Sequence, residues 1–388
     1  ALGNRLAPGA AVAIGRHGRI VHMRGYGALD WAPDSTAVAG AGSFSSVGTS
    51  SGASAESTPF AAAGATAFPA PAPVTESTLF DVASLTKVVA TTTAAMILED
   101  RGLLALDSTV GHFLPKFVAR DSMKRAITVR HLLTHQGGLE AYAPLYLDSL
   151  VRGREAYLDR IAERPLRSAP GTATVYSDWD MILLQLVVEK VSGSPLEWFF
   201  EDHVAQPLGL RETVFRPAPP LLPRTAATAK DSTRGGILRG VVHDGNAWAL
   251  GGVSGHAGLF SSARDLAAFA HMMLSGGRLG ATSLVDPATV ARWTAPQVDG
   301  SSRALGWDTP SGDRSSAGRH FSQRSFGHTG FTGTSLWIDP EKGVFVVLLT
   351  NRVHSAGTTP AGQVLALRAA VADAVQASIL DAPVIRWR

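Results

Sequence analysis

The sequence Ser84-Leu-Thr-Lys87 places a hydroxyl and an amine three residues apart. On a helix this spacing puts both side chains on one face, about one turn apart, where they can share a hydrogen bond. A serine hydroxyl is a weak nucleophile until a neighbouring base takes its proton, and a lysine can act as that base only if burial lowers its pKa. The pattern therefore predicts a nucleophilic serine with an amine partner, although isolated copies arise by chance in many chains.

Residues 84–101 are the best helix candidate in the chain. The segment contains two adjacent valines and three consecutive threonines, and such β-branched side chains lower intrinsic helix propensity. Its stability must then come from burial on most sides, which predicts a central helix that ends at Gly102. Burial would desolvate Lys87, and the N-terminus of the helix would stabilise negative charge that develops near Ser84.

Two further motifs follow in the chain, Tyr176-Ser-Asp178 and Gly327-His-Thr-Gly330. Each is uninformative alone, since a tyrosine at a helix start usually packs in the core and a glycine-rich segment before a strand is usually a turn. Taken in this order with Ser84 to Lys87, they resemble the three elements of the penicillin-recognising serine enzymes. Those elements are S-x-x-K, a central Y-x-N or S-x-N triplet, and K-T-G or H-T-G on a strand.

Three longer segments extend the resemblance, at residues 131–139, 255–262 and 327–334. They read HLLTHQGGL, GHAGLFSS and GHTGFTGT. Similar segments are common in class C β-lactamases, D-alanyl-D-alanine carboxypeptidases and family VIII carboxylesterases. The resemblance covers nearly the whole chain except residues 34–75, and its motifs do not fix the substrate.

The resemblance implies a role for each matching residue. Ser84 is then the nucleophile, Lys87 its proton partner, and Tyr176 the general base or the proton shuttle to the leaving group. The backbone N–H groups of Ser84 and Phe331 would form the oxyanion hole. Loss of one such donor typically slows a reaction on the order of a hundredfold or more, so the strand geometry matters as much as the side chains.

The expected substrate-binding residues depart from the family pattern at two positions. Asp178 stands where the family often has asparagine, and an ionised aspartate can only accept hydrogen bonds. It could pair with the Lys87 ammonium and raise its pKa, which would weaken Lys87 as a base. His328 replaces the lysine of the β-lactamases, so a substrate carboxylate would be held less by charge and more by the Thr329 hydroxyl, with Gly330 beside it.

Several histidines suggest a metal site at first sight. His131 and His135 have the i, i+4 spacing of a metal-binding helix, but the H-E-x-x-H motif needs glutamate where Leu132 stands. Further potential ligands lie in two loops: His243, Asp244, Asn246 and His256. Because no complete ligand set is evident, we interpret these residues as structural hydrogen-bonding groups and expect neither a metal nor a cofactor.

Length and composition set wider limits. The 388 residues suffice for two lobes or one large domain, and 45% hydrophobic and 17% charged residues are ordinary for a soluble globular protein. The net charge is +3 and the arginines are scattered singly, so no nucleic-acid partner is expected. No apolar stretch approaches about 18 residues, so no transmembrane segment is predicted.

The absence of cysteine excludes disulfides, thiolate metal sites and a cysteine nucleophile, but leaves the compartment open. The first six residues lack an initiator methionine and the apolar core of a signal sequence, as a processed N-terminus would. Export to the periplasm is somewhat favoured, and a cytoplasmic location stays open. The sequence does not indicate the oligomeric state.

Strand-like segments occur at both ends of the chain, with helices between them. The predicted strands are residues 10–14, 20–26, 334–338 and 344–350, paired as two hairpins with turns at 17–18 and 339–343. The predicted helices are residues 84–101, 129–134, 179–192, 263–274 and 361–379. The fourth of these follows Ser262, with Asp265 in the pattern of a capping box.

These elements predict an α/β (α+β) fold of the serine β-lactamase and transpeptidase type. An antiparallel sheet from both termini would be flanked by helices, with an all-helical region inserted. We expect one catalytic domain over residues 1–388, with an α/β lobe at about 1–83 and 240–388 and a helical lobe at about 84–239.

Residues 34–75 are low in complexity and almost uncharged, which predicts a flexible surface insertion. The segment contains Gly48-Thr-Ser-Ser-Gly52, a formal match to the G-x-S-x-G nucleophile elbow. That motif needs a strand before it and a helix after it, and neither is predicted here, so we reject it.

The favoured reaction is hydrolysis of an amide or ester, of the β-lactam or D-alanyl peptide type, through an acyl-enzyme on Ser84. The substrate is expected to be a small molecule or a peptide. One alternative is a carboxylesterase that acts on short acyl esters and hardly turns over β-lactams. A second is a penicillin-binding receptor or assembly protein that is acylated but barely deacylates.

Overall fold

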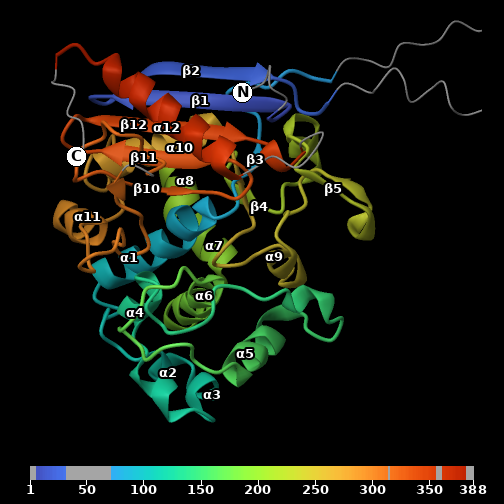
Figure 1. Ribbon diagram of the computed structural model, residues 1–388, viewed down its shortest axis with the longest axis vertical. Coiled ribbons are helices and arrows are strands. Elements are labelled where there is room, and N and C mark those ends of the chain that lie inside the picture. Colours follow the sequence, from blue (N-terminus) through green and yellow to red (C-terminus); the bar gives the residue numbers. More distant parts are fainter. Residues whose placement is uncertain (1–5, 32–70, 313–314, 355–360, 382–388) are drawn as a thin grey trace, which may run out of the picture.

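A five-stranded antiparallel sheet and a helical region make up the structure, a computed structural model that describes residues 6–31, 71–312, 315–354 and 361–381 (Figure 1). The strand order is β10-β11-β12-β1-β2. The strands are β1 (Gly9–Arg16), β2 (Arg19–Gly27), β10 (Phe326–Thr329), β11 (Ser335–Asp339) and β12 (Val344–Thr350). Pairing of β1 with β12 places Ala13 opposite Val347. This confirms the predicted antiparallel sheet built from both ends of the chain.

Two helices cover the opposite faces of this sheet, α10 (Ala263–Leu274) and α12 (Ala361–Ala377). Side chains alternate along β12, so Val347 packs in the main core with residues of α10, while Val346 packs with Ala372 of α12. β12 is buried along its whole length because both of its faces are covered. The predicted cap of α10 forms, since Ser262 Oγ accepts the Asp265 N–H at 3.2 Å.

The predicted first hairpin also forms, through a two-residue turn at His17 and Gly18. Their φ angles are 47° and 76°. Positive φ at both turn residues is the geometry that matches the right-handed twist of paired strands.

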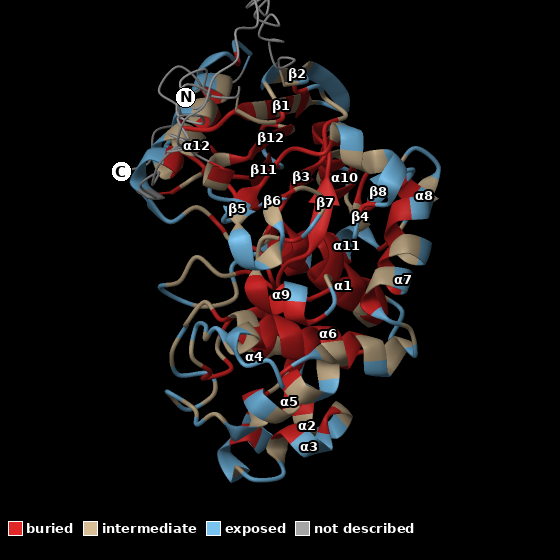
Figure 2. Ribbon diagram, turned by 90° about the vertical axis from the view of Figure 1, so that its right-hand side faces the viewer, coloured by how far each residue is buried: buried red, intermediate tan, exposed pale blue. Residues whose placement is uncertain are grey.

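The most buried helices are α1 (Thr93–Asp100) and α6 (Asp178–Ser192), which run through the centre of the molecule (Figure 2). The helix predicted over residues 84–101 is central and buried as expected, but it is not uniform. A π-helical stretch, η1 (Lys87–Thr92), precedes α1. Such stretches interrupt helices most often at functional sites, and nothing in the local sequence predicts this one.

A second sheet of three short strands supports the segment that carries Ser84. Its order is β3-β7-β4, with β3 (Phe80–Asp81), β7 (Leu259–Ser261) and β4 (Val214–Phe215). β3 ends three residues before Ser84, and β7 follows the GHAG segment at 255–258. The sheet therefore places these two sequence motifs side by side.

The other elements complete the helical region and its margins. Near the site lie α4 (Val129–Leu133) and α9 (Gly245–Ala249). The remainder are α2 (Val110–Phe113), α3 (Pro115–Val118), α5 (Gly153–Glu163), α7 (Leu196–Phe200), α8 (Gln206–Leu208), α11 (Pro287–Thr294), β5 (Ala229–Asp231), β6 (Gly236–Leu238), β8 (Arg278–Leu279) and β9 (Thr282–Ser283).

The rejected motif at residues 48–52, and most of the predicted insertion at 34–75, lie outside the described residues. The lobe boundaries near residues 84 and 239 stay a prediction. Among the helices of the described ranges, none has both the length and the apolar character needed to cross a membrane.

Candidate active site

Lys87 lies at the centre of the site with its side chain fully buried. Its Nζ atom donates to Ser84 Oγ at 2.9 Å and to the His256 carbonyl oxygen at 3.1 Å. It also pairs with Asp178 Oδ1 at 2.8 Å. Three acceptors match the three N–H donors of an ammonium group, so this geometry fits a protonated lysine.

The charge on Lys87 follows from the balance of burial and its neighbours. Burial by itself would lower the pKa of Lys87, but the Asp178 carboxylate and the Tyr176 hydroxyl outweigh it and raise the pKa above the usual 10.5. The pairing of Asp178 with Lys87 that the sequence suggested is therefore present. In the resting protein Lys87 is an ammonium and cannot itself accept the serine proton.

Tyr176 lies among two cations and two imidazole rings. Lys87 Nζ is 4.9 Å and Arg303 Cζ is 5.0 Å from the centre of its ring. The rings of His135 and His328 lie 4.7 Å and 5.9 Å from it. Burial raises the pKa of the Tyr176 hydroxyl, and the charge of Lys87 opposes that rise. The phenol is therefore neutral at pH 7 and has a cationic neighbour that favours loss of its proton.

Ser84 follows a strained turn. Ala83 has a φ of 48°, in the left-handed region that residues with a Cβ atom rarely adopt. The described residues offer no hydrogen-bond acceptor to the backbone N–H of Ser84. This N–H is therefore available to a bound group at the start of the helix.

Phe331 is the second predicted oxyanion donor. Within the described ranges its backbone N–H has no acceptor either. Thr332 Oγ1 donates to the Asp81 carbonyl at 2.7 Å and Thr334 Oγ1 to the Val82 carbonyl at 3.0 Å, which ties this loop to the segment before the serine. Both donors line one cavity, as an oxyanion hole requires.

Gly330 permits this close approach. A Cβ atom at this position would lie 2.4 Å from the Val82 carbonyl oxygen and 2.1 Å from Thr334 Oγ1. Any other residue would push the end of β10 away from the Ser84 segment. The glycine of the His-Thr-Gly motif is thus explained by contact rather than by turn conformation.

His328 is buried on β10 and carries its proton on Nδ1. Nδ1 lies 2.8 Å from the Thr329 carbonyl oxygen, which can only accept a hydrogen bond. Burial lowers the pKa of His328 well below 6.5, and the charges of Lys87 and Arg303 lower it further. The imidazole is neutral, so the positive charge that a lysine would supply here is missing.

The cavity above Ser84 measures about 990 Å³ and contains the predicted site residues Tyr176, Asp178, His328, Thr329, Gly330 and Phe331 in its lining. Four arginines also line it: Arg234, Arg303, Arg352 and Arg368. Arg303 pairs with Asp308 at 2.6 Å. Arg368 donates to the carbonyl oxygens of Gly330 and Thr334 at 2.6 Å and 2.9 Å, and burial lowers its pKa to about 10.

None of these arginines was identified as a site residue from the sequence. Arg303 lies in an irregular loop and Arg368 on α12, and neither belongs to a motif. Burial lowers the pKa of Arg368 only to about 10, so this arginine remains cationic at neutral pH. Both arginines lie on the cavity wall. They can supply the positive charge that His328 lacks.

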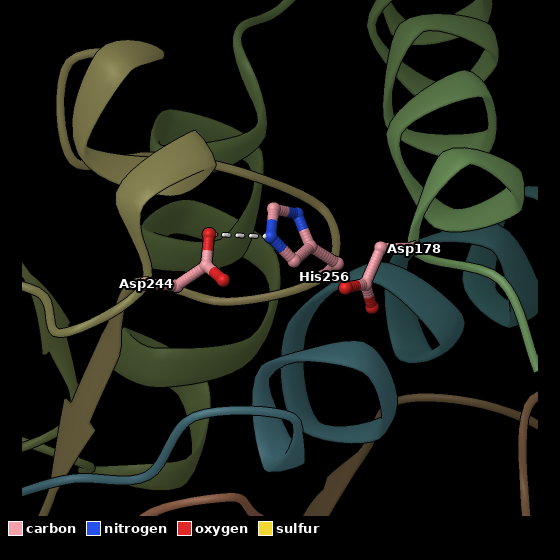
Figure 3. A group of neighbouring side chains, drawn as sticks. All are labelled: Asp178, Asp244 and His256. Carbon is pink, nitrogen blue, oxygen red and sulfur yellow. Dashed lines mark hydrogen bonds and ion pairs between the residues drawn. The ribbon is translucent and has the colours of Figure 1, made fainter. Parts of the chain in front are cut away.

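Asp178, Asp244 and His256 form a compact group beside Lys87, and Figure 3 shows their side chains converging from three segments. Their potential ligand atoms all lie within 4.8 Å of one another. His256 Nε2 contacts Asp244 Oδ1 at 2.8 Å, and its Nδ1 contacts Ser254 Oγ at 2.7 Å. Both imidazole nitrogens thus have protein partners, and Asp178 has the Lys87 ammonium, so the group is a hydrogen-bonded ion-pair network.

The paired histidines of the 131–139 segment have separate roles. His131 Nδ1 accepts the Thr128 N–H at 3.3 Å, as part of a capping box on α4. His135 has a φ of 57°, and its Nδ1 accepts the Ser177 N–H at 3.2 Å. His135 therefore binds the backbone of the residue after Tyr176, and its ring lies beside the Tyr176 ring at the start of α6.

Comparisons with known proteins identify the family of this chain. The family model described as Beta-lactamase matches residues 2–370. A protein from Escherichia coli (strain K12) named "Putative D-alanyl-D-alanine carboxypeptidase" is 35% identical over 316 residues, which covers 75% of this chain and 73% of the relative.

Solved structures share the fold at lower identity. EstCE1, a hydrolase with promiscuous acyltransferase activity, gives a TM-score of 0.68 at 24% identity over 96% of this chain and 98% of its own. A class C β-lactamase from Rhodobacter sphaeroides gives a TM-score of 0.67 at 20% identity, over 96% and 95%. The family match over nearly the whole chain and the 35% identical relative show that this chain belongs to the Beta-lactamase family of serine hydrolases.

Proposed function

We propose that the protein hydrolyses an amide or ester of the D-alanyl peptide or β-lactam type through an acyl-enzyme on Ser84. The observation that carries the proposal is the position of Lys87 Nζ, 2.9 Å from Ser84 Oγ and 2.8 Å from Asp178 Oδ1. Attack of Oγ on the substrate carbonyl would form an ester with Ser84 and release the amine or alcohol. Water would then cleave that ester and regenerate the hydroxyl.

The proton leaves Ser84 through the coupled pair of Lys87 and Tyr176. A neutral phenol beside an ammonium contains no base, so the competent form is the pair that has lost one proton. The Tyr176 oxygen then accepts the serine proton and passes it to the leaving group. Because Asp178 raises the pKa values of both partners, and burial also raises that of Tyr176, the fraction of competent pair grows with pH.

The oxyanion that forms on the substrate carbonyl would be held by the N–H groups of Ser84 and Phe331. Preorganised backbone donors of this kind are worth about a hundredfold or more each in rate. A substrate carboxylate would be bound by the Thr329 hydroxyl and by the guanidinium groups of Arg303 and Arg368. Both arginines line the cavity that contains Ser84.

Two observations bear on the substrate. The name of the Escherichia coli relative supports a D-alanyl peptide with a free C-terminal carboxylate. The neutral His328 supports the esterase alternative, because an ester without a carboxylate needs no cation at this position. The arginines on the cavity wall favour the peptide.

The test is a comparison of three substrates at equal protein concentration. A D-Ala-D-Ala peptide, a chromogenic cephalosporin and a p-nitrophenyl ester would be assayed with the wild type, Ser84→Ala and Arg368→Gln. Hydrolysis of the peptide that is lost in Ser84→Ala and reduced in Arg368→Gln through a higher KM supports the proposal. Rapid ester turnover with no peptide or cephalosporin turnover would replace it with the carboxylesterase function.

A further inference from the structure

Asp81 is the last residue of β3 and lies three positions before Ser84, with only 2% of its surface exposed. Its two carboxylate oxygens bind segments that are far apart in the chain. Oδ1 accepts the Ala83 N–H at 2.8 Å, and Oδ2 accepts the His243 N–H at 2.7 Å. The proposed reaction uses none of these atoms.

The first bond acts on the turn that presents the serine. A short acidic side chain that accepts the N–H two residues ahead stabilises a local turn without help from a helix or strand. Ala83 needs such support, because its φ of 48° costs about 1 kcal/mol or more for a residue with a Cβ atom. The direction of the Ser84 N–H depends on this conformation.

The second bond, which Asp81 Oδ2 accepts from the His243 N–H, holds a residue that packs against Phe331, the other predicted oxyanion donor. The ring of His243 is stacked on the Phe331 ring, with centres 5.5 Å apart and planes 18° from parallel. The Asp81 carbonyl oxygen also accepts from Thr332 Oγ1 at 2.7 Å. Asp81 therefore contacts both the segment that carries the Ser84 N–H and the residues that pack around the Phe331 N–H.

We propose that Asp81 is a positioning residue that sets the relative placement of the Ser84 and Phe331 N–H groups. The inference rests on the proposed acyl-enzyme function, because it needs both N–H groups to bind the oxyanion. A change of a few tenths of an ångström between the two donors weakens stabilisation of the transition state more than binding of the substrate. Loss of Asp81 should then lower kcat and leave KM nearly unchanged.

Protonation of Asp81 offers a readout that a purely structural residue would lack. Burial raises its pKa to about 6, the two backbone N–H bonds oppose this, Asp244 raises it further and Arg234 lowers it. His243, the remaining titratable group at this contact, is held neutral because burial lowers its pKa. A protonated carboxyl loses one acceptor, so kcat should fall as the pH drops through about 6.

Stability should move in the opposite direction. The pKa of Asp81 in the folded protein lies above its unfolded value of 3.8, so the folded state binds the proton more readily. Its contribution to stability is present at low pH and is lost as the pH rises through about 6. Lower activity at pH 5 therefore cannot result from destabilisation by this group.

Asp265 provides a matched control within the same chain. It is also buried, accepts the Glu212 N–H at 2.7 Å and Thr213 Oγ1 at 2.9 Å, and has a pKa that burial raises to about 6. It lies at the start of α10 and does not line the cavity. Asp265→Asn should reduce stability without changing the pH dependence of kcat.

The experiment measures kcat and KM for a p-nitrophenyl ester from pH 4.5 to 8, together with thermal unfolding, for the wild type, Asp81→Asn, Asp265→Asn and Ser84→Ala. Activity should rise with pH in every active variant, because the Lys87 and Tyr176 pair must lose a proton. In the wild type and Asp265→Asn we expect, in addition to this rise, a separate acid decline near pH 6. We expect Asp81→Asn to lack it, with kcat roughly tenfold to a hundredfold below wild type at pH 7.5.

Two results would overturn the inference: an Asp81→Asn variant that keeps the wild-type kcat and acid decline, or a wild type whose kcat shows no separate decline near pH 6 beyond its general rise with pH. The second result would overturn the inference even if Asp81→Asn does not fold, because it is measured on the wild type. Residual hydrolysis in Ser84→Ala would instead overturn the acyl-enzyme function itself. An inactive Ser84→Ala beside a normal Asp81→Asn would reject only the role of Asp81.

Discussion

Lys87 and Lys124, two of the buried lysines, have different surroundings. Lys87 has no exposed surface, and its Nζ contacts a serine hydroxyl, a backbone carbonyl and the Asp178 carboxylate. Lys124, 1% exposed, donates to the carbonyl oxygens of Ile161 at 3.4 Å and Ala162 at 2.6 Å, and lies 5.1 Å from the centre of the Phe117 ring.

The two environments shift the pKa of the amine in opposite directions. Burial lowers the pKa of Lys124, and the charge of Asp121 opposes this only in part. At Lys87 the adjacent Asp178 outweighs burial, so the pKa rises. Burial alone therefore does not define a catalytic lysine. A carboxylate in contact with the amine keeps it protonated. A neighbouring serine that lines a cavity is what allows the amine to take part in a reaction.

The largest effect on activity should come from Lys87→Met, with Lys124→Met as the matched variant. Lys87→Met should lower kcat/KM by on the order of a thousandfold, because it removes the proton partner of Ser84 but keeps the volume of the side chain. Lys124→Met should leave kcat/KM unchanged and cost about 1–2 kcal/mol of unfolding free energy, since two carbonyls lose a donor. Ester hydrolysis and denaturant unfolding measure the two effects. An equal loss of kcat/KM in both variants would show that the two lysines do not differ in their contribution to the reaction.

Tyr176→Phe should have the next largest effect. The substitution keeps the ring beside Lys87 and Arg303 but removes the hydroxyl that we propose to accept and pass on the serine proton. We expect kcat to fall about a hundredfold or more, with KM within about threefold of wild type. Stopped-flow measurement of acylation would locate the loss in the first step. An unchanged acylation rate would exclude Tyr176 from proton transfer.

Asp178→Asn should shift the pH profile rather than abolish activity. Without the carboxylate, only Tyr176 still opposes the effect of burial on Lys87, so the pKa of Lys87 falls and the deprotonated pair forms at lower pH. The alkaline rise in kcat/KM should therefore move down by about one pH unit or more.

The ion pair also has a defined effect on stability. Since the pKa of Lys87 is raised above 10.5, the stabilisation is fully present below that pH and is lost only as the pH rises through the higher folded value.

A suitable control for the pH–rate profile of Asp178→Asn is Asp107→Asn. This variant breaks an exposed pair with Arg130 and should leave the pH–rate profile unchanged. A profile that stays fixed in Asp178→Asn would show that Asp178 does not control Lys87.

The smallest effect is expected for Asp180→Asn, two residues further along the same helix. Burial raises the pKa of Asp180 well above 3.8, so its contribution to stability is present at low pH and is lost as the pH rises through the folded value. Asparagine is neutral at every pH, and the variant should be at least as stable as wild type at pH 8. Thermal unfolding at pH 5 and 8 tests this. A shift of the pH–rate profile as large as in Asp178→Asn would contradict it.

The sequence allowed the sheet and the serine–lysine pair to be predicted because both depend on local patterns. The terminal hairpins follow from alternating apolar residues and turn residues, and the spacing of Ser84 and Lys87 follows from helix geometry. The contact of Asp178 with Lys87 could be anticipated from charge alone, once the order of motifs suggested a common site.

The remaining features depend on packing between distant segments. Arg303 and Arg368 reach the cavity from a loop and from the C-terminal helix, and no motif distinguishes them from other scattered arginines. Asp81 resembles any aspartate at a strand end until His243 is placed beside it. His256 was interpreted as a hydrogen-bonding residue. Its ring does bond Asp244, but its carbonyl contact with Lys87 could not be foreseen, because every residue has a carbonyl.

The most direct test of the proposed reaction is intact-protein mass spectrometry of wild type, Ser84→Ala and Lys87→Met after brief exposure to penicillin or an activated ester. An acyl adduct should form rapidly on the wild type, map to the peptide that contains Ser84, and disappear with time as water cleaves it. Ser84→Ala should show no adduct, and Lys87→Met should acquire one slowly. An adduct that persists on the wild type would indicate the receptor alternative, and an adduct that forms equally on Ser84→Ala would contradict Ser84 as the nucleophile.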